Sequence, residues 1–298
     1  DAEAELVYIT TGMGPVWRYN GETGEGSLLP IKACDIAIGP DGLIYGWGDD
    51  GSYQGKIARY TRDCKPAPIE GLGSHLYGRV YGRFGRGNNA PGMGIDWKGQ
   101  AYVNCGFNNC HIRVYGNDGK LVEYDRKAVY GDDGKQPGGS AIISYVLDQG
   151  GSLRLDPAGN IYVMEIGLPK GFVIPKGFEK DPAYKLCSAT IYKFSPKGGE
   201  FKKIPEGWNA EGSVMTYTAP SAPVSGAWNS TQSVCHCMRP RFDVDAYGRL
   251  YIPNGVTYNL AIRDNSDNEI ITFGAYGNWD SQGPASKEPK PEIPLGWP

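Results

Sequence analysis

The hydrophobic and polar positions of the chain repeat one pattern four times. In each copy a run of alternating apolar residues leads into a tight turn that ends on glycine, and a second run follows with tyrosine two or three residues in. Alternation with a period of two is typical of β-strands with one buried face. Each copy therefore predicts a β-hairpin, and the four copies are 36–45, 94–102, 153–162 and 242–251.

The spacing of the copies predicts the architecture. Their turn glycines are Gly42, Gly99, Gly159 and Gly248, so the first three copies follow one another at intervals of about 60 residues. Units of about 40 to 60 residues with roughly four strands each are typical of β-propeller blades. A third strand follows each copy, at 56–60, 112–115, 190–194 and 260–263. We therefore expect an all-β protein of the β-propeller class.

The N-terminal residues resemble the later part of one further unit. Residues 6–9 match a second strand and residues 15–19 match a third strand, but no first strand precedes them. Many propellers take such a strand from the other end of the chain, which removes a free sheet edge. Residues 292–298 do not form a convincing strand. We predict a single domain over 1–298, with four complete blades and one split or partial blade of a six-bladed ring that lacks a C-terminal portion.

Two segments interrupt the repeat. Residues 168–186 fall between the second and third strands of the third unit, and residues 205–235 precede the fourth unit and are rich in Gly, Ser, Pro and Thr. We expect both to be long loops, and loops of this length are often functional.

The composition excludes two classes of partner. The chain has 298 residues and a formal net charge of −3, so it lacks the basic surface that nucleic-acid binding requires. No apolar run approaches the roughly 18 residues of a membrane-spanning helix, so we expect no membrane span. The 44 glycines and 20 tyrosines suit an all-β protein with many turns.

The seven cysteines indicate an oxidising compartment. Disulfides persist outside the reducing cytosol, so we expect a secreted, periplasmic or extracellular protein. The odd count leaves at least one thiol that is unpaired or is committed to a metal, a cofactor or another chain.

Several phrases of the chain resemble NHL-repeat propellers. They include residues 159–163, the turn 117–120, and the fourth unit with Arg241–Arg249, 264–269 and 273–281. The fourth unit is similar to that of secreted bacterial NHL-like proteins that carry a Cys-x-Cys just before Arg-Phe-Asp. This resemblance implies the propeller fold and says little about activity, because propellers serve as enzymes, receptors and scaffolds.

The first chemical motif has the form Cys-x4-Cys-His, with Cys105, Cys110 and His111. A c-type haem attachment site usually reads Cys-x2-Cys-His, with two thiols bonded to the haem and the histidine bound to iron, and a four-residue spacer resembles a minority variant. The alternative is a local disulfide, which would contribute on the order of 2–3 kcal/mol. In NHL repeats an Asp and an Arg stand at about these two cysteine positions, so a disulfide would replace a polar contact.

The second motif is Cys235-His236-Cys237-Met238, immediately before the first strand of the fourth unit. Cysteines separated by one residue rarely bond to each other, because the bridge is strained. They bind a soft metal such as copper(I) or zinc, for which His236 and Met238 add ligands, or they form disulfides with distant partners such as Cys187.

Propeller topology places both motifs on one face, because the loop after a second strand and the entry to a first strand lie on the same side. We therefore predict a non-catalytic binding or assembly module for a protein partner, with a Cys/His-rich face. The alternative is an electron-transfer propeller, in which Cys105, Cys110 and His111 hold haem c with Met238 or His236 as second iron ligand, or Cys235, His236 and Cys237 hold a soft metal.

A third class is a propeller hydrolase or lyase. Lactonase-like propellers resemble this fold but use Glu, Asn and Asp ligands around the central channel, and that set finds no match in the sequence. Amidating-lyase propellers hold zinc with three histidines at strand starts, where this chain has Gly92 or Gly94 and Pro240. The sequence therefore favours a protein that is not an enzyme.

Overall fold

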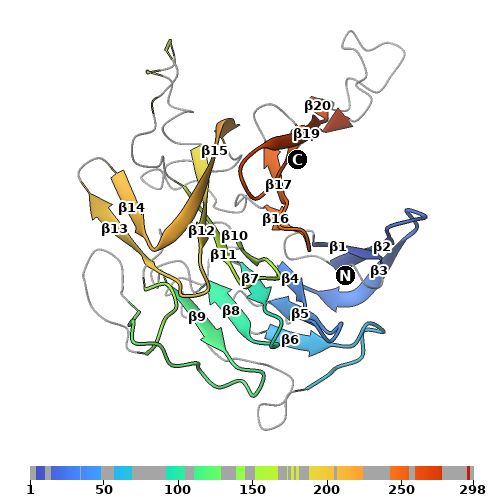
Figure 1. Ribbon diagram of the computed structural model, residues 1–298. Coiled ribbons are helices and arrows are strands. Elements are labelled where there is room, and N and C mark those ends of the chain that lie inside the picture. Colours follow the sequence, from blue (N-terminus) through green and yellow to red (C-terminus); the bar gives the residue numbers. More distant parts are fainter. Residues whose placement is uncertain are drawn as a thin grey trace, which may run out of the picture.

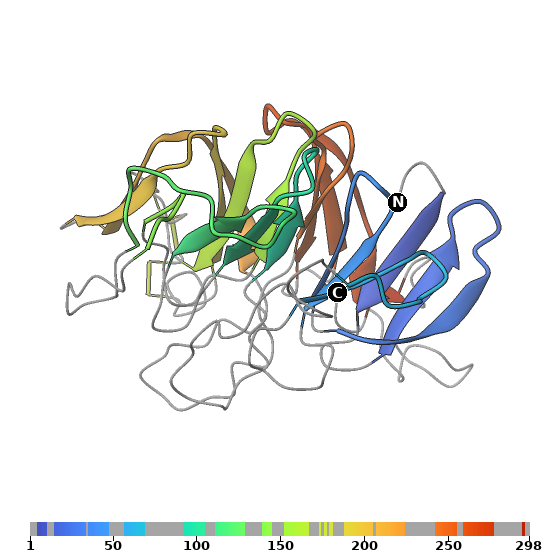
Figure 2. The same cartoon turned by 90° about the horizontal axis from the view of Figure 1, so that it is seen from below.

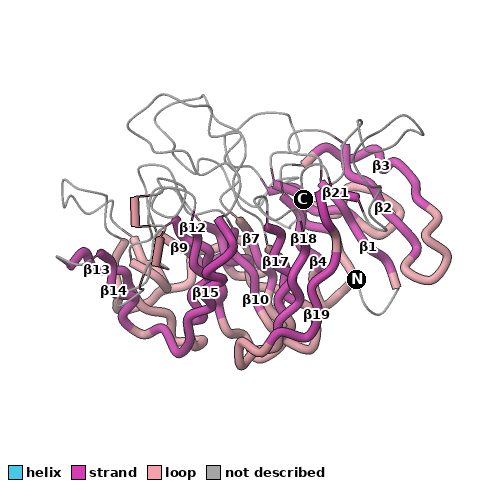
Figure 3. Tube along the Cα trace, turned by 90° about the horizontal axis from the view of Figure 1, so that it is seen from above, coloured by secondary structure: helices cyan, strands magenta, loops and turns pink. Residues whose placement is uncertain are grey.

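The protein is an all-β propeller. The computed structural model describes residues 5–10, 15–33, 35–47, 57–68, 92–104, 111–128, 139–144, 152–166, 173, 176–177, 179–180, 188–204, 207–223, 242–254, 259–276 and 294–295. These residues form strands, turns and loops without a helix (Figure 3). Five antiparallel sheets are arranged around a common centre, with β4, β7, β10 and β16 innermost (Figure 1). This arrangement confirms the predicted fold class.

The first three sheets have three strands each and follow one another along the chain, side by side in Figure 2. Their strands are β1 (Leu6–Thr10), β2 (Pro15–Asn20) and β3 (Gly26–Lys32); β4 (Asp35–Ile38), β5 (Ile44–Trp47) and β6 (Ile57–Tyr60); β7 (Met93–Ile95), β8 (Ala101–Asn104) and β9 (Ile112–Tyr115). In the second and third sheets a single bridge, Tyr60 with Pro66 and Tyr115 with Leu121, takes the place of a fourth strand.

The last two sheets have four strands each, which pair in the order β10-β11-β12-β15 and β16-β17-β18-β19. Their strands are β10 (Ser152–Leu155), β11 (Ile161–Ile166), β12 (Ser188–Phe194) and β15 (Ser213–Pro223); β16 (Asp243–Val244), β17 (Leu250–Asn254), β18 (Asn259–Arg263) and β19 (Glu269–Phe273). Two small sheets complete the described strands, namely the hairpin of β13 (Glu200–Ile204) and β14 (Gly207–Glu211), and the parallel pair of β20 (Ala275–Tyr276) and β21 (Pro294–Leu295).

The repeated hairpins form as predicted, and their turns explain the glycines. Gly42, Gly99, Gly159 and Gly248 have φ angles of 73°, 75°, 80° and 76°. This left-handed backbone is costly for any residue with a Cβ, which is why each copy of the pattern ends its turn on glycine. The predicted third strands are also present, as β6, β9, β12 and β18.

Four apolar clusters join neighbouring sheets into one core. Each cluster combines buried side chains of one sheet with those of the next, and burial of a Leu, Ile or Phe side chain stabilises the fold by roughly 1.5–3 kcal/mol. From the first interface to the fourth, the clusters include Val16 with Ile44, Trp47 with Met93, Tyr102 with Leu153, and Tyr162 with Leu250.

The first sheet differs from the others because its first described strand, β1, corresponds to the second strand of the later sheets. Tyr8 of β1 faces the second sheet, just as Tyr45, Tyr102 and Tyr162 on the second strands of later sheets face the sheet that follows. Strand β1 is the edge of its sheet, and the described residues supply no strand on its far side. The number of blades, with the partial first unit and the six-bladed ring, remains a prediction.

The prediction of a long loop over 205–235 is wrong for its first half. Residues 207–211 form β14, and 213–223 form β15, the fourth strand of its sheet. Threonine and tyrosine at 216–218 have high strand propensity, which outweighs the Gly, Ser and Pro content on which the loop prediction rested. Residues 224–235 and most of the loop predicted over 168–186 lie outside the described residues.

Across the described residues we find no helix with the length and hydropathy required to cross a membrane.

Candidate functional site: the central cavity

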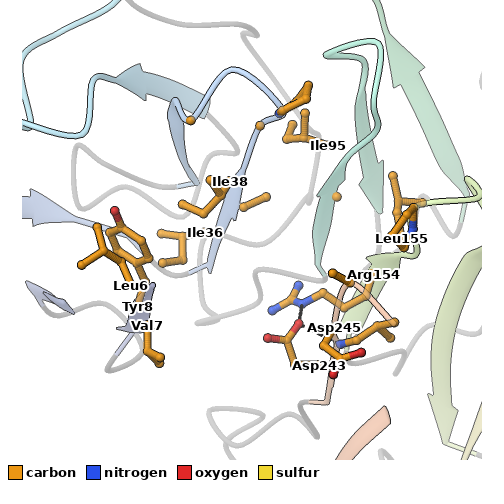
Figure 4. Close-up of a pocket in the computed structure, with 18 of the residues that line it drawn as sticks. Leu6, Val7, Tyr8, Ile36, Ile38, Ile95, Arg154, Leu155, Asp243 and Asp245 are labelled. Atoms are coloured by element: carbon orange, nitrogen blue, oxygen red, sulfur yellow. Dashed lines mark hydrogen bonds and ion pairs between the residues drawn. The ribbon is translucent and has the colours of Figure 1, made fainter. Parts of the chain in front are cut away.

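The innermost strands surround a cavity of about 1100 Å³ (Figure 4). Strands β1, β4, β7, β10 and β16 each contribute to its wall, and the turns after β4, β7, β10 and β16 form one rim. Leu6, Val7 and Tyr8 lie on one side of the cavity, and Arg154, Asp243 and Asp245 lie on the other. Ligand sites in propellers and barrels commonly lie where such inner strands converge, so this cavity is the candidate site.

Arg154 ties three sheets together at the cavity wall. Its guanidinium donates to both carboxylate oxygens of Asp35, at 3.0 and 3.1 Å, and its Nε donates to Asp243 Oδ1 at 2.9 Å. Asp35 Oδ2 also accepts the backbone N–H of Met93 at 3.1 Å, which links a fourth sheet. These contacts fix strands β4, β7, β10 and β16 relative to one another.

The two carboxylates keep Arg154 charged inside the protein. Burial by itself would lower the pKa of Arg154, but the charges and hydrogen bonds of Asp35 and Asp243 outweigh burial and raise it above the ordinary value. The Asp35 side chain is only 3% exposed, so this ion pair is shielded from solvent, whereas the Asp243 side chain is 70% exposed. The buried pair is therefore a structural element, and Asp243 remains accessible from the cavity.

Three further acids around the cavity are held by their own turns. Asp96, Asp156 and Asp245 each stand three residues before a turn glycine, and each carboxylate accepts the backbone N–H four residues on, at 2.8, 2.9 and 2.9 Å. Despite partial burial, the hydrogen bonds and Arg249 lower the pKa of Asp245. The lowered pKa keeps Asp245 charged at neutral pH, so this carboxylate adds negative potential to the rim.

The same acids accept the hydroxyl groups of the repeated tyrosines. The Tyr162 hydroxyl donates to Asp156 Oδ2 at 3.0 Å, and the Tyr251 hydroxyl donates to Asp245 Oδ2 at 3.2 Å. Each pair links the turn to the second strand. Burial is the main cause that raises the pKa of Tyr162, and the neighbouring Asp156 raises it further.

The cavity as a whole is acidic. Its described lining contains seven carboxylate side chains and two guanidinium groups, namely Glu5, Glu22, Asp35, Asp96, Asp156, Asp243 and Asp245 against Arg62 and Arg154. A concave surface with one sign of charge focuses the electrostatic potential, so the cavity attracts positively charged groups.

Of the residues predicted from the two cysteine motifs, only His111 is described. It lies directly before β9, and its side chain is buried, with 2% exposed. Neither ring nitrogen has a hydrogen-bond partner, and burial together with the nearby Arg113 lowers the pKa of His111 to about 3. The other predicted residues, Cys105, Cys110, Cys235, His236, Cys237 and Met238, lie outside the described residues.

Within the described residues, no three His, Cys, Asp or Glu side chains are grouped as they would be around a metal ion. Cys64 carries a free, half-buried thiol next to the core between the first two sheets, and burial raises its pKa.

Sequence reasoning missed the Arg154 network. An alignment of the four copies could have found it. Five residues before the turn glycine, the copies have Ala37, Gly94, Arg154 and Asp243. The same position in every copy lines the central cavity, so an arginine and an aspartate at this position of the third and fourth copies predict a contact between their two inner strands. Asp35 has no such signal, because it stands at a different position of its copy.

Neither a family model nor a curated protein sequence matches the chain. Among solved structures, it is similar to virginiamycin B lyase from Staphylococcus aureus, with a TM-score of 0.44 and 12% identity over 93% of this chain and 68% of that one. It is also similar to the calcium-binding protein regucalcin from Agrobacterium tumefaciens, with a TM-score of 0.44 and 10% identity over 93% and 72% of the two chains. A chain of a nidogen/laminin complex gives a TM-score of 0.41 and 14% identity over 90% and 92%.

Proposed function

We propose that this propeller is a non-catalytic binding module of the secreted or periplasmic space, and that its acidic central cavity holds a positively charged segment of a partner protein. The observation that supports this proposal is the excess of carboxylates around the cavity. Complementary charge steers a partner toward its site and suppresses partners of the wrong sign.

The charged groups around the cavity are already held by an ion pair or by backbone hydrogen bonds, which favours binding over catalysis. Asp35 and Arg154 neutralise each other, and Asp96, Asp156 and Asp245 are occupied by backbone N–H groups of their own turns. A general acid or base has to gain and lose a proton during each turnover. Carboxylates held in this way serve better as fixed negative charges for recognition.

Selection of random peptides displayed on phage tests the proposal. We expect selected peptides to be rich in Lys and Arg, and to lose binding when Glu22 and Asp243 at the cavity are replaced by Lys. A matched control is Glu269→Lys, which reverses one exposed charge on β19 outside the cavity. Peptides that bind the cavity variant as well as the native protein would refute the proposed site.

The oxidation state of the cysteines tests whether the protein belongs to an oxidising compartment. Protein purified from the periplasm or medium without reductant, then unfolded and labelled with a maleimide, is expected to bind one label, on Cys64. Seven labels would show that no cysteine is oxidised and would remove the support for an oxidising compartment.

His111 favours a second candidate function, the binding of haem c or a soft metal ion. A buried imidazole with a pKa near 3 is neutral at physiological pH, and its two unpartnered nitrogens leave a lone pair available for a metal. Cys105 and Cys110 would then supply thiols, and Met238 or His236 a further ligand. A Soret absorption band with a mass increase of one haem supports this candidate, whereas an intact mass that shows only oxidised thiols excludes haem.

A further inference from the structure

Asp243 presents a carboxylate oxygen to the central cavity. Its side chain is 70% exposed and lies beside Arg154 in the cavity wall (Figure 4). Its Oδ1 accepts the Arg154 Nε–H at 2.9 Å and the Val244 backbone N–H at 3.0 Å. Both hydrogen bonds that the described residues make to this carboxylate therefore end on Oδ1, and Oδ2 is available to a ligand in the cavity.

The acids of the turns are less available than Asp243. Asp96 and Asp156 are buried, with 7% and 9% exposed. Both oxygens of Asp245 are occupied, because Oδ1 accepts two backbone N–H groups of its own turn at 2.9 Å each, and Oδ2 accepts the Arg249 Nε–H and the Tyr251 hydroxyl at 2.6 and 3.2 Å. A ligand could bind these carboxylates directly only by breaking such bonds, which is costly.

The Arg154 cluster contains one more carboxylate than its guanidinium can balance. The terminal nitrogens of Arg154 donate to both oxygens of Asp35, at 3.0 and 3.1 Å, and to the carbonyls of Met93 and Leu153, at 3.3 and 2.9 Å. Only its Nε reaches Asp243. Because the Asp35 side chain is 3% exposed, the excess negative charge is presented by Asp243. The contact with Arg154 also orients Asp243 in advance, which lowers the cost of binding.

A single available oxygen suits an ammonium better than a guanidinium. A guanidinium binds a carboxylate best as a planar fork, with two parallel hydrogen bonds to the two oxygens. At Asp243 the Arg154 Nε–H and the Val244 N–H already occupy Oδ1, so a second fork finds one oxygen instead of two. A lysine ammonium is a compact charge that needs one acceptor here, and in a cavity of about 1100 Å³ its other protons remain hydrated.

The opposite wall of the cavity suits the stem of a lysine side chain. Val7, Ile36 and Ile38 line the cavity on the other side from Asp243 (Figure 4). Lysine packs its four methylene groups on apolar surface while its ammonium stays on a polar partner. A free polyamine carries several ammonium groups instead, and each would need an available carboxylate. The combination of one such carboxylate with an apolar wall therefore favours lysine.

We propose that Asp243 binds the partner directly, and that Asp243 Oδ2 accepts a hydrogen bond from the primary ammonium of a lysine side chain in preference to a guanidinium. This proposal rests on the proposed binding function and names the side chain that the cavity selects. The other carboxylates of the cavity supply the negative potential that attracts any cation, and Asp243 supplies the specificity.

Four synthetic heptapeptides test the preference by fluorescence anisotropy. They share a sequence of serine and glycine with one leucine on each side of the central residue, which is lysine, arginine, trimethyllysine or acetyllysine. The lysine peptide should bind about tenfold more tightly than the arginine and trimethyllysine peptides. Trimethyllysine keeps the charge and loses the donor, so it separates the hydrogen bond from the attraction of charge. The acetyllysine peptide, which has no charge, should bind most weakly.

Two variants of the protein test whether Asp243 makes the contact. Asp243→Asn should abolish the preference, so that the lysine and arginine peptides bind equally weakly. Glu22→Gln is the matched control, because it removes one exposed charge of the same cavity. It should weaken both peptides by the same factor and keep the tenfold preference for lysine. Thermal unfolding of each variant shows that it is folded.

Four results would overturn the proposal: no binding of any of the four peptides, equal binding of the lysine and arginine peptides to the native protein, a preference for lysine that survives Asp243→Asn, or displacement of the lysine peptide by spermidine at a concentration below the dissociation constant of the peptide. The last result would assign the cavity to a free polyamine. The first three leave the proposed function standing as long as cationic peptides selected on phage still lose binding when Glu22 and Asp243 are replaced by Lys.

Discussion

The fourth sheet, β10-β11-β12-β15, and the first sheet, β1-β2-β3, present the same tyrosine in two different surroundings. Tyr162 is fully buried between two sheets, and its hydroxyl donates to Asp156. Tyr8 packs against the next sheet as well, but its hydroxyl finds no acceptor. The difference is the inner strand with its turn, which the fourth sheet has and the first lacks.

The two sheets also differ in their outer contacts. Apolar clusters cover both faces of the fourth sheet, whereas one face of the first sheet exposes Val7, Ile9 and Leu28 by 51%, 46% and 53%. The first sheet thus carries an exposed apolar face that the fourth sheet does not have. Among the described residues, the second, third and fourth sheets therefore each take part in two apolar clusters, whereas the first and the fifth sheets each take part in one.

The largest effect on stability should come from the ion pair through which Arg154 of the fourth sheet is linked to Asp35 of the second sheet. Arg154→Met leaves the Asp35 carboxylate buried without its partner, and we expect the free energy of unfolding to fall by about 3–5 kcal/mol. Urea unfolding measures the change. Adding Asp35→Asn should recover part of the loss, because the buried negative charge is removed. A loss below 1 kcal/mol for Arg154→Met would mean that Asp35 is solvated.

One substitution made in both sheets tests their packing. Leu153→Ala empties a fully buried site between the third and fourth sheets and should cost about 2–5 kcal/mol. Leu28→Ala, on the exposed face of the first sheet, should change the unfolding free energy by less than about 0.5 kcal/mol. Equal costs in urea unfolding would show that the face of the first sheet is covered in solution.

Acid should lower the free energy of unfolding through His111, which lies directly before β9 of the third sheet. The unfolded chain binds a proton near pH 6.5, whereas the native His111 binds it only near pH 3, so lowering the pH between these values favours unfolding. The expected loss is about 1.4 kcal/mol for each pH unit in that window. His111→Leu should remove this slope in urea unfolding at stepwise pH. Residues 1–33 contain no histidine, so the first sheet has no such dependence.

The smallest effect compares the two tyrosines directly. Tyr162→Phe removes a buried hydrogen bond to a carboxylate and should cost about 1–3 kcal/mol. Tyr8→Phe should be neutral or slightly stabilising, because it removes a buried hydroxyl without a partner. Thermal unfolding of both variants measures the difference, and a cost at Tyr8 that equals the cost at Tyr162 would contradict the comparison.

Much of the fold could be predicted because its rule is local. The period of two predicts the strands, and the left-handed turn requires Gly42, Gly99, Gly159 and Gly248, so the sequence alone identifies four hairpins. The strands expected at 6–9 and 15–19 were predictable in the same way and are present as β1 and β2. Strand β15 was not, because its Thr and Tyr residues lie within a segment rich in Gly, Ser and Pro.

The candidate site could be predicted only in small part. The cysteine motifs identified His111, which does not line the central cavity and whose burial and lowered pKa no pattern along the chain reveals. Arg154 stood at a repeat position that faces the centre, yet nothing in its own segment identifies its partners. Asp243 stands on the inner strand β16, and its contact with Arg154 of β10 joins two segments that lie 89 residues apart.

The sequence by itself determined the repeat, the hairpins and the propeller class, because alternation and turn glycines act within ten residues of chain. Only the tertiary structure decided which charges meet, since Arg154 is separated from Asp35 by 119 residues and from Asp243 by 89. It also decided that Tyr8 lacks the acceptor that its counterparts have. Both depend on how the sheets close around a centre, and that closure is set by packing between segments far apart in sequence.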